Sequence, residues 1–134
     1  MKYLLDSNAV IALMKGHPGF VSELRRHKPH DFAIPAIVVH ELFYGAYKGQ
    51  RVVDNLARVD ALQFETLDFD KEDARVAGEI RASLASLGTP IGTYDVLIAG
   101  QAVARDLILI THNVREFERV AKLRFEDWES LPSG

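Results

Sequence analysis

The sequence predicts a single α/β domain with a mostly parallel central sheet. Short apolar segments, typical of buried strands, alternate with longer segments of helical spacing, and no hairpin signal joins two strands. The 134 residues are 48% hydrophobic and 26% charged, which is the size and composition of one globular domain and excludes two full domains. We therefore expect one domain over residues 1–134, without internal repeats or an interdomain linker.

The N-terminal half is expected to contain two strands and four helices. Residues 2–6 form a short apolar run that ends in Asp-Ser-Asn, which is typical of a buried strand leading into a helix cap. The helices are indicated by apolar residues three or four positions apart. The expected elements are a strand at 2–6, helices at 9–14 and 20–24, a strand at 31–34, and helices at 35–47 and 52–59.

The C-terminal half is expected to alternate strands and helices in the same way. Asp70–Asp73 caps a long helix that ends before a glycine, and Thr93 caps a helix that is apolar on nearly all sides and should be central. Phe125 and Trp128 are expected to pack back onto the body, and residues 131–134 to fray. The expected elements are a weak strand at 65–69, helices at 70–87 and 94–104, a fully apolar strand at 107–110, and a short helix at 115–120.

Composition and charge exclude several classes of protein. Without cysteine the chain can form neither a disulfide nor a cysteine-ligated zinc site. Sixteen Lys and Arg against nineteen Asp and Glu give a formal net charge of -3, so bulk charge does not predict a nucleic-acid binder. There is no signal-peptide core and no apolar run of about 18 residues that would span a membrane. We therefore expect a cytoplasmic protein with no membrane partner.

Three acids and one amide occupy positions where two interpretations are open. Asp6 follows the first buried strand and is either a helix N-cap or a ligand at the sheet edge. Glu41 lies on or beside the apolar stripe of its helix, where it is either paired or extended outward. Asp95 occupies the first turn of the most apolar helix, where an acid also stabilises the helix N-terminus. Asn113 follows the last apolar strand and is either a site residue or a turn residue.

Taken together, these residues predict a metal site. Asp6 and Asn113 fall at the carboxyl ends of predicted parallel strands, where such sheets bind ligands. Three carboxylates that converge without basic partners repel one another, so a cation is the natural counterweight. Oxygen ligands select a hard ion, and Mg²⁺ or Mn²⁺ is expected rather than zinc. Such an ion suits phosphodiester hydrolysis, because it orients a water molecule and stabilises charge on the phosphate.

Competing catalytic motifs are absent from the sequence. The run His40-Glu41-Leu42-Phe43-Tyr44 begins like a zinc-protease helix but has Tyr in place of the second His. There is no phosphate-binding glycine loop that ends in Lys and Ser or Thr, and no Gly-x-Ser-x-Gly turn. The five histidines form no ligand set by spacing, and His112 is the one beside the proposed site.

Four blocks of sequence, in order and at matching intervals, resemble the motifs of PIN-domain ribonucleases. The similarity extends from residue 2 to about Trp128 and is most marked for the VapC toxins of bacterial toxin-antitoxin pairs. The blocks are Leu4–Asn8, Val39–Gly45, Pro90–Ala99 and Ile110–Phe117.

The resemblance implies a three-layer α/β/α sandwich and a Mg²⁺- or Mn²⁺-dependent endoribonuclease, the toxin of a type II toxin-antitoxin system. It also implies a homodimer, a higher complex with a small cognate antitoxin whose tail occupies the active-site groove, and an RNA substrate that is commonly tRNA. By position, Asp6, Glu41 and Asp95 match the three acidic metal ligands of the family. Asn113 matches a fourth catalytic position that is Asp in many members, so it acts either on the metal or through water, and Glu116 is a further acid in the same block.

Departures from the family pattern keep alternatives open. Ser7 stands where Thr is commoner and keeps a hydroxyl that can orient Asp6, while Thr93 stands where Pro is commoner. The departure at Asn113 motivates a second hypothesis, a catalytically weakened PIN fold that binds RNA or an antitoxin. A phosphatase or DNase is disfavoured, because no nucleophilic Asp motif is present. Five cations flank the blocks and form either a basic rim for RNA or solvated helix surface: Lys15, Lys48, Arg51, Arg81 and Arg115.

Overall fold

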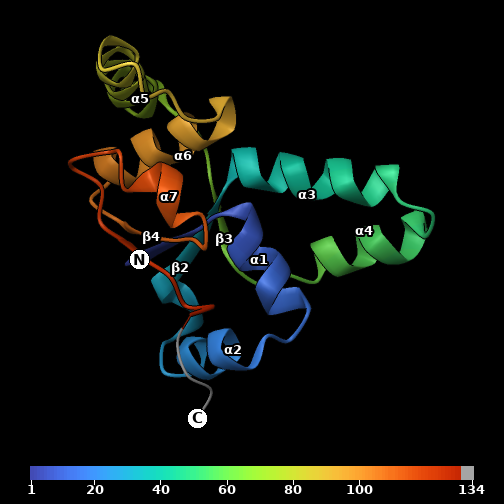
Figure 1. Cartoon of the computed structure of the whole chain (residues 1–134). Coiled ribbons are helices and arrows are strands. Elements are labelled where there is room, and N and C mark those ends of the chain that lie inside the picture. Colours follow the sequence, from blue (N-terminus) through green and yellow to red (C-terminus); the bar gives the residue numbers. More distant parts are fainter. Residues whose placement is uncertain (131–134) are drawn as a thin grey trace.

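Five strands form one parallel sheet at the centre of the fold (Figure 1). The computed structural model describes residues 1–130, and within them the strands lie in the order β3-β2-β1-β4-β5, with every neighbouring pair parallel. The predicted α/β class with a parallel sheet is confirmed. The strands are β1 (Tyr3–Leu5), β2 (Phe32–Pro35), β3 (Glu65–Leu67), β4 (Ile108–Ile110) and β5 (Phe125–Glu126).

Helices connect the strands and flank the sheet on both sides, so the three layers expected from the resemblance are present. In Figure 1, α5 and α6 lie above the strands, α1 lies beside them on the right, and α2 lies below them. No helix within residues 1–130 has the length and apolar character needed to cross a membrane. The helices are α1 (Ser7–Met14), α2 (Pro18–Leu24), the 3-10 helix η1 (Pro29–Asp31), α3 (Ala36–Lys48), α4 (Val52–Asp60), α5 (Lys71–Ser86), α6 (Thr93–Ala104) and α7 (Val114–Phe117).

The structure differs from the sequence-based expectation at three places. Phe125 belongs to the short edge strand β5, which its two residues were too few to indicate. The last helix is α7 and ends at Phe117, three residues earlier than expected. Thr93 is the first residue of α6 rather than its cap. Gly92 takes the cap position without a side-chain cap hydrogen bond, and its N–H donates to the Glu116 side chain.

The pairing of β1 with β4 brings two polar segments together at one edge of the sheet. All three residues of β1 are buried, because the strand lies at the centre of the sheet between β2 and β4. Leu5 is in register with Ile110, and the Asp6 N–H donates to the Ile110 carbonyl at 3.2 Å. Asp6 therefore lies beside Thr111, where both strands end and the sheet opens to solvent.

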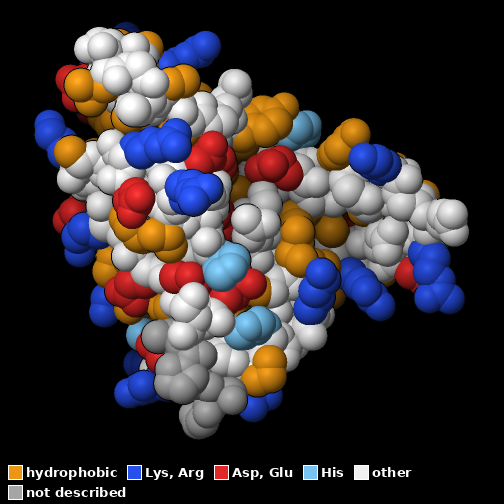
Figure 2. Space-filling model, viewed as in Figure 1, with side chains coloured by type: hydrophobic (Ala, Val, Ile, Leu, Met, Phe, Trp, Pro, Cys, Tyr) orange, Lys and Arg blue, Asp and Glu red, His pale blue; other side chains and the backbone are white. Residues whose placement is uncertain are grey.

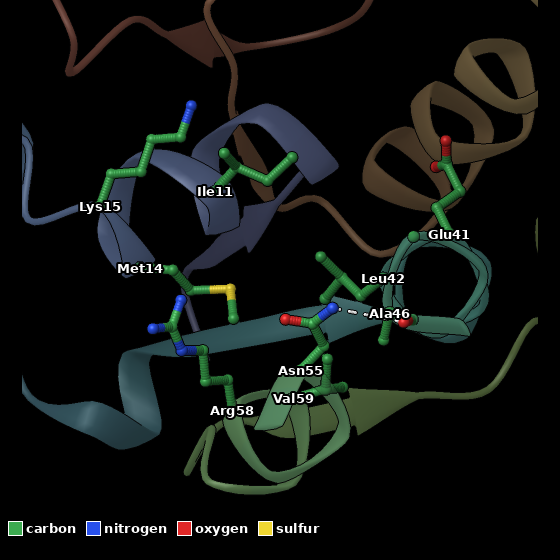
Figure 3. Close-up of a pocket in the computed structure, with 10 residues that line it drawn as sticks. Ile11, Met14, Lys15, Glu41, Leu42, Ala46, Asn55, Arg58 and Val59 are labelled. Atoms are coloured by element: carbon green, nitrogen blue, oxygen red, sulfur yellow. Dashed lines mark hydrogen bonds between the residues drawn. The ribbon is translucent and has the colours of Figure 1, made fainter. Parts of the chain in front are cut away.

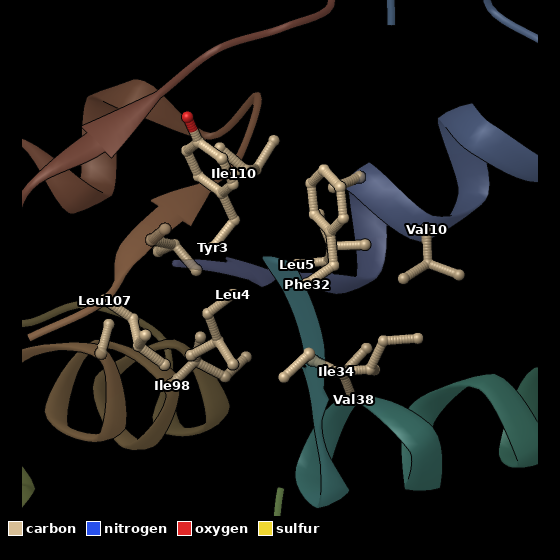
Figure 4. Close-up of a cluster of buried hydrophobic side chains, with 14 of the residues drawn as sticks. Tyr3, Leu4, Leu5, Val10, Phe32, Ile34, Val38, Ile98, Leu107 and Ile110 are labelled. Atoms are coloured by element: carbon tan, nitrogen blue, oxygen red, sulfur yellow. The ribbon is translucent and has the colours of Figure 1, made fainter. Parts of the chain in front are cut away.

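A buried aromatic cluster anchors the C-terminal segment, as expected for Trp128. The Trp128 indole is 1% exposed, stacks on the His27 ring at 5.3 Å and contacts Tyr3 and Phe32 edge to face. Its Nε1–H donates to Glu126 at 2.9 Å. Figure 4 shows Tyr3 and Phe32 among the aliphatic side chains of the same core. The fraying expected for residues 131–134 lies outside the described residues.

Small residues and one buried ion pair hold α5 against α6, which carries Asp95. Gly100 lies so close to α5 that a Cβ atom there would be 2.5 Å from the Ala77 Cβ. Asp73, which the sequence indicated only as part of the cap, is 1% exposed and accepts from Arg105 at 3.0 Å and from Gln101 at 3.1 Å. Burial opposes ionisation of Asp73, but these donors hold its pKa below the ordinary value. The position of α6 therefore depends on contacts far from its N-terminus.

Replacing Gly100 by Ala is expected to lower the free energy of unfolding by about 1 to 3 kcal/mol, because the added methyl group overpacks the α5–α6 contact. The matched control is Gly78→Ala on α5, where an added Cβ meets nothing within 4 Å and the helix gains about 0.5 to 1 kcal/mol. Urea unfolding followed by circular dichroism measures both. A Gly100→Ala protein as stable as Gly78→Ala would contradict this packing.

Candidate active site

Asp6 is the N-cap of α1, which is the first of the two interpretations of its sequence position, and it also lies at the sheet edge, where the second interpretation expects a ligand. Its carboxylate caps α1 by accepting the Ala9 N–H at 2.8 Å, and the side chain is only 4% exposed at the edge of the sheet. Burial raises its pKa to about 6, although hydrogen bonds from Thr111 and Ala9 oppose the rise. The negative charges of Glu129 and Glu41 raise it further. The cap therefore leaves a buried, electrostatically strained carboxylate at the sheet edge.

Glu41 is half-buried on α3 and is positioned by Ser7. The Ser7 hydroxyl donates to the Glu41 carboxylate at 2.8 Å and links the start of α1 to α3. The expectation that Ser7 orients Asp6 is therefore wrong. Thr111, a buried residue that sequence reasoning did not single out, takes that part instead. A polar side chain directly after an apolar strand was the signal that could have found it.

Asp95 pairs with Glu116, and Asn113 supports that pair. Asp95 is half-buried, and its pKa is raised to about 7 by burial, by a hydrogen bond with Glu116 and by the charges of Glu116, Asp6 and Glu41. The Asn113 side-chain amide donates to Glu116 at 2.9 Å. Hydrogen bonds from Asp95, Asn113 and the Gly92 N–H hold the pKa of Glu116 below its ordinary value, although burial opposes this. The hydrogen bond between the two carboxyl groups therefore favours a proton on Asp95 over one on Glu116.

The carboxylates of Asp6, Glu41, Asp95 and Glu116, here called the acid cluster, form no ion pair with Lys or Arg in the described residues, although the charge of Arg119 lowers the pKa of Glu116. Within residues 1–130, no Lys or Arg nitrogen lies within 4.0 Å of any of the four carboxylates. By contrast, the buried carboxylate of Asp73 forms an ion pair with Arg105. Because burial is not offset by an ion pair, the pKa values of Asp6 and Asp95 are raised.

The chemistry of the acid cluster fits a hard divalent cation. Four oxygen-bearing side chains around a sheet edge are the donors that such ions prefer, and a bound cation would relieve their mutual repulsion. Asp6, Glu41 and Asp95 do not form a compact triad in the described part of the chain, where only His112, Asp127 and Glu129 have ligand atoms all within 4.8 Å of one another. Binding of one ion by the three predicted ligands therefore requires water ligands or a small inward movement, as is usual for Mg²⁺.

His112 contacts the C-terminal segment through Asp127. Its Nδ1 lies 3.0 Å from the Asp127 carboxylate, and this contact together with the charges of Asp127 and Glu129 raises the pKa of His112. Asp127 in turn accepts from Ser130 and from the Glu129 N–H. The exposed His112 ring is thus an ion-paired neighbour of the acid cluster.

A groove of about 310 Å³ leads from Glu41 between α1, α3 and α4 (Figure 3). Its walls are largely apolar, with Ile11 and Met14 of α1 exposed to 40% and 37%. Lys15, one of the predicted rim cations, lies on this groove together with Arg58, which the sequence analysis did not select. The other four predicted cations are exposed: Lys48, Arg51, Arg81 and Arg115.

Comparisons with known proteins agree with this arrangement. The model of the PIN domain family matches residues 3–123. The tRNA(fMet)-specific endonuclease VapC of Salmonella typhimurium is 42% identical over 130 residues, which cover 96% of this chain and 98% of that protein. Ribonuclease VapC2 of Haemophilus influenzae is 36% identical with the same coverage.

Solved structures of toxin-antitoxin complexes have the same fold. The chain superposes with a TM-score of 0.90 on a chain of DNA-bound VapBC from Salmonella typhimurium, at 42% identity and with 96% of this chain and 98% of that chain covered. For VapBC2 from Rickettsia felis the TM-score is 0.87 at 32% identity, with coverage of 96% and 99%. The chain belongs to the PIN domain family and, within it, to the VapC ribonucleases.

Proposed function

We propose that this protein is the toxin of a type II toxin-antitoxin pair and acts as a single PIN domain that cleaves phosphodiester bonds of tRNA with Mg²⁺ or Mn²⁺. The observation that carries the proposal is the acid cluster, whose four carboxylates have no Lys or Arg nitrogen within 4.0 Å in the described chain. Nucleases of the PIN family depend on metal ions. The relative in Salmonella typhimurium is named for its action on tRNA(fMet), which supports tRNA as the substrate class.

Asp6, Glu41 and Asp95 are the residues proposed to hold the ion. Their oxygen atoms favour Mg²⁺ or Mn²⁺ over softer metals. When bound, the ion would supply charge stabilisation at the phosphate and a more acidic water molecule. A cation of this kind also explains why an acidic chain can act on RNA, since the phosphate approaches a site whose negative charge is offset.

The surrounding residues of the chain prepare the three carboxylates. The Ala9 N–H and the Thr111 side chain fix the orientation of Asp6, and the Ser7 hydroxyl fixes Glu41. Because these donors are already in place, little ordering is needed when a ligand binds. Such preorganisation is what separates a binding site from a chance group of acids.

Asn113 is proposed to act through Glu116 rather than as a direct ligand. Its amide donates to the Glu116 carboxylate at 2.9 Å, and Glu116 in turn bonds to Asp95. The loss of a carboxylate at position 113 is thereby compensated by an acid three residues later. This argues against the alternative of a catalytically weakened binding module, which rested on Asn113 alone.

An antitoxin is proposed to bind the groove between α1, α3 and α4. The groove is apolar, begins at Glu41 of the acid cluster and carries Lys15 and Arg58. A small partner that covers it would block access to the site. We further infer that the toxin is a cytoplasmic homodimer that joins a higher complex with the antitoxin, as expected for the VapC family, and light scattering with and without the antitoxin tests the assembly.

Asp6→Asn, Glu41→Gln and Asp95→Asn are each expected to reduce Mg²⁺-dependent cleavage of tRNA at least about 100-fold, because each removes one negative ligand. Gel electrophoresis of labelled tRNA measures the rate, with EDTA as the metal-free reference. The control is Glu79→Gln, an exposed acid on α5, which should cleave at the wild-type rate. Full activity in a folded Asp95→Asn protein would contradict the proposal.

The metal-free protein is expected to lose stability as the pH rises from about 4 to about 8. The pKa of Asp6 is about 6 in the folded state against 3.8 ordinarily, so the folded state holds its proton more tightly, and ionisation costs about 3 kcal/mol of stability. In EDTA we expect the Tm to be about 10 °C lower at pH 8 than at pH 4.5 from this residue.

Addition of Mg²⁺ at pH 8 should restore most of that loss, because the ion binds only the ionised, folded state. Asp6→Asn should flatten the pH dependence and remove the response to Mg²⁺. Thermal unfolding monitored by circular dichroism measures both effects. If the Tm in EDTA does not change with pH, folding does not raise the pKa of Asp6.

Met14→Asp is expected to weaken binding of the cognate antitoxin at least about 10-fold, because it places a charge on the apolar wall of the groove. Val53→Asp on α4 is the matched control, since Val53 is 81% exposed and does not line the groove. Co-purification and calorimetric titration with the product of the adjacent antitoxin gene provide the measurement. Equal loss of affinity in both variants would count against this surface.

A further inference from the structure

Two exposed aromatic side chains belong to residues that directly precede two members of the acid cluster in the sequence. His40 precedes Glu41 on α3, and Tyr94 precedes Asp95 at the start of α6. Although they come from different helices, their ring centroids lie 5.7 Å apart with an interplanar angle of 70°. The contact joins the two helices at the point where each presents its carboxylate.

The His40–Tyr94 pair leaves aromatic surface open to solvent. In an edge-to-face contact, one ring presents its edge to the other, so each ring keeps at least one free face. Tyr94 is 47% exposed and His40 is also exposed. Where α3 approaches α6 in Figure 2, hydrophobic and histidine side chains meet above acidic ones. An exposed ring pair offers a stacking surface to a ligand with a flat apolar face.

We propose that His40 and Tyr94 form a stacking subsite for one unpaired base of the RNA substrate, next to the phosphodiester bond that is cleaved. Proteins that read single-stranded RNA stack splayed bases on Tyr, Phe, Trp and His side chains. His40 and Tyr94 directly precede Glu41 and Asp95, so a base held between the two helices would lie one residue along each helix from a member of the acid cluster. The subsite rests on the proposed ribonuclease function and adds the requirement for an unpaired nucleotide at the cut.

A base fits this surface better than a protein side chain does. The apolar groove proposed for the antitoxin is lined by Glu41 and residues of α1, α3 and α4, but not by His40 or Tyr94. The ring pair is therefore a separate surface that shares only the acid cluster with the groove. The α3 surface continues with the ring of Tyr44, which has Lys48 Nζ 5.6 Å from its centroid. Rings followed by a cation match the alternation of bases and phosphates in a single strand.

The test is steady-state cleavage, with Mg²⁺, of a stem-loop oligoribonucleotide taken from tRNA(fMet), the RNA for which the Salmonella typhimurium relative is named. Tyr94→Ala should raise KM about 5- to 100-fold, the range expected for loss of one base stack. Tyr94→Phe keeps the ring and should retain the wild-type KM. His40→Ala is a second, independent variant and should raise KM in the same direction. Tyr47→Ala is the control, because it removes a tyrosine farther along α3 that is even more exposed, at 64% against 47% for Tyr94.

Abasic nucleotides, placed one at a time in the loop, separate stacking from a general structural effect. One abasic position should raise KM for the wild type but cause no further increase for Tyr94→Ala, because the same contact is lost only once. If the abasic substitution and Tyr94→Ala raise KM additively at every position of the loop, the stacking subsite is contradicted. An unchanged KM in folded Tyr94→Ala would also contradict it, as would a changed oligomeric state with unchanged KM, which would assign the rings to a protein contact.

Failure of the subsite is distinguishable from failure of the proposed function. If the wild type cleaves the oligonucleotide and the ring variants match it, only the subsite is wrong. If the wild type cleaves neither the oligonucleotide nor intact tRNA with Mg²⁺, the ribonuclease proposal and the subsite fall together.

Discussion

Parallel pairing between β1 and β4 is the constraint on which the site depends. It ends both strands at the same edge and carries Asp6 to the Ile110 carbonyl, within reach of Thr111. Every other member of the acid cluster is brought to that edge by a helix: Glu41 by α3, Asp95 by α6 and Glu116 by α7. Because β1 is buried on all sides, Asp6 has no freedom to turn away from its neighbours. The fold thus holds charges together that would separate in a flexible chain.

Bringing these carboxylates together raises the pKa of Asp6 and Asp95, because no ion pair offsets their burial. Asp73 is as buried as Asp6, but Arg105 and Gln101 satisfy it and its pKa falls. Asp6 has only neutral donors, and its pKa rises. The same molecule therefore contains one buried acid whose ionised form is stabilised by an arginine and another whose ionisation costs stability. That contrast is what makes Asp6, rather than Asp73, a candidate for binding a cation.

The sequence predicted the class of fold and four of the five strands, because buried parallel strands are short apolar runs that stand out from helical spacing. It could not predict β5, whose two residues depend on pairing with β4, nor the burial of Asp73, which arises from a distant arginine. The acids at 6, 41 and 95 were recognisable because each breaks an apolar pattern. The partners of Ser7 and Asn113 were not, because a hydroxyl or amide can turn to any of several acceptors until the tertiary structure is known.

The central claim is that the acid cluster exchanges protons for a divalent cation. Calorimetric titration of Mn²⁺ into the wild-type protein, repeated in buffers of different ionisation enthalpy, counts the protons released per ion bound. With the pKa values of Asp6 and Asp95 at about 6 and about 7, release of at least about one proton is expected at pH 6 and almost none at pH 8. Absence of binding, or binding without proton release at pH 6, would contradict the account.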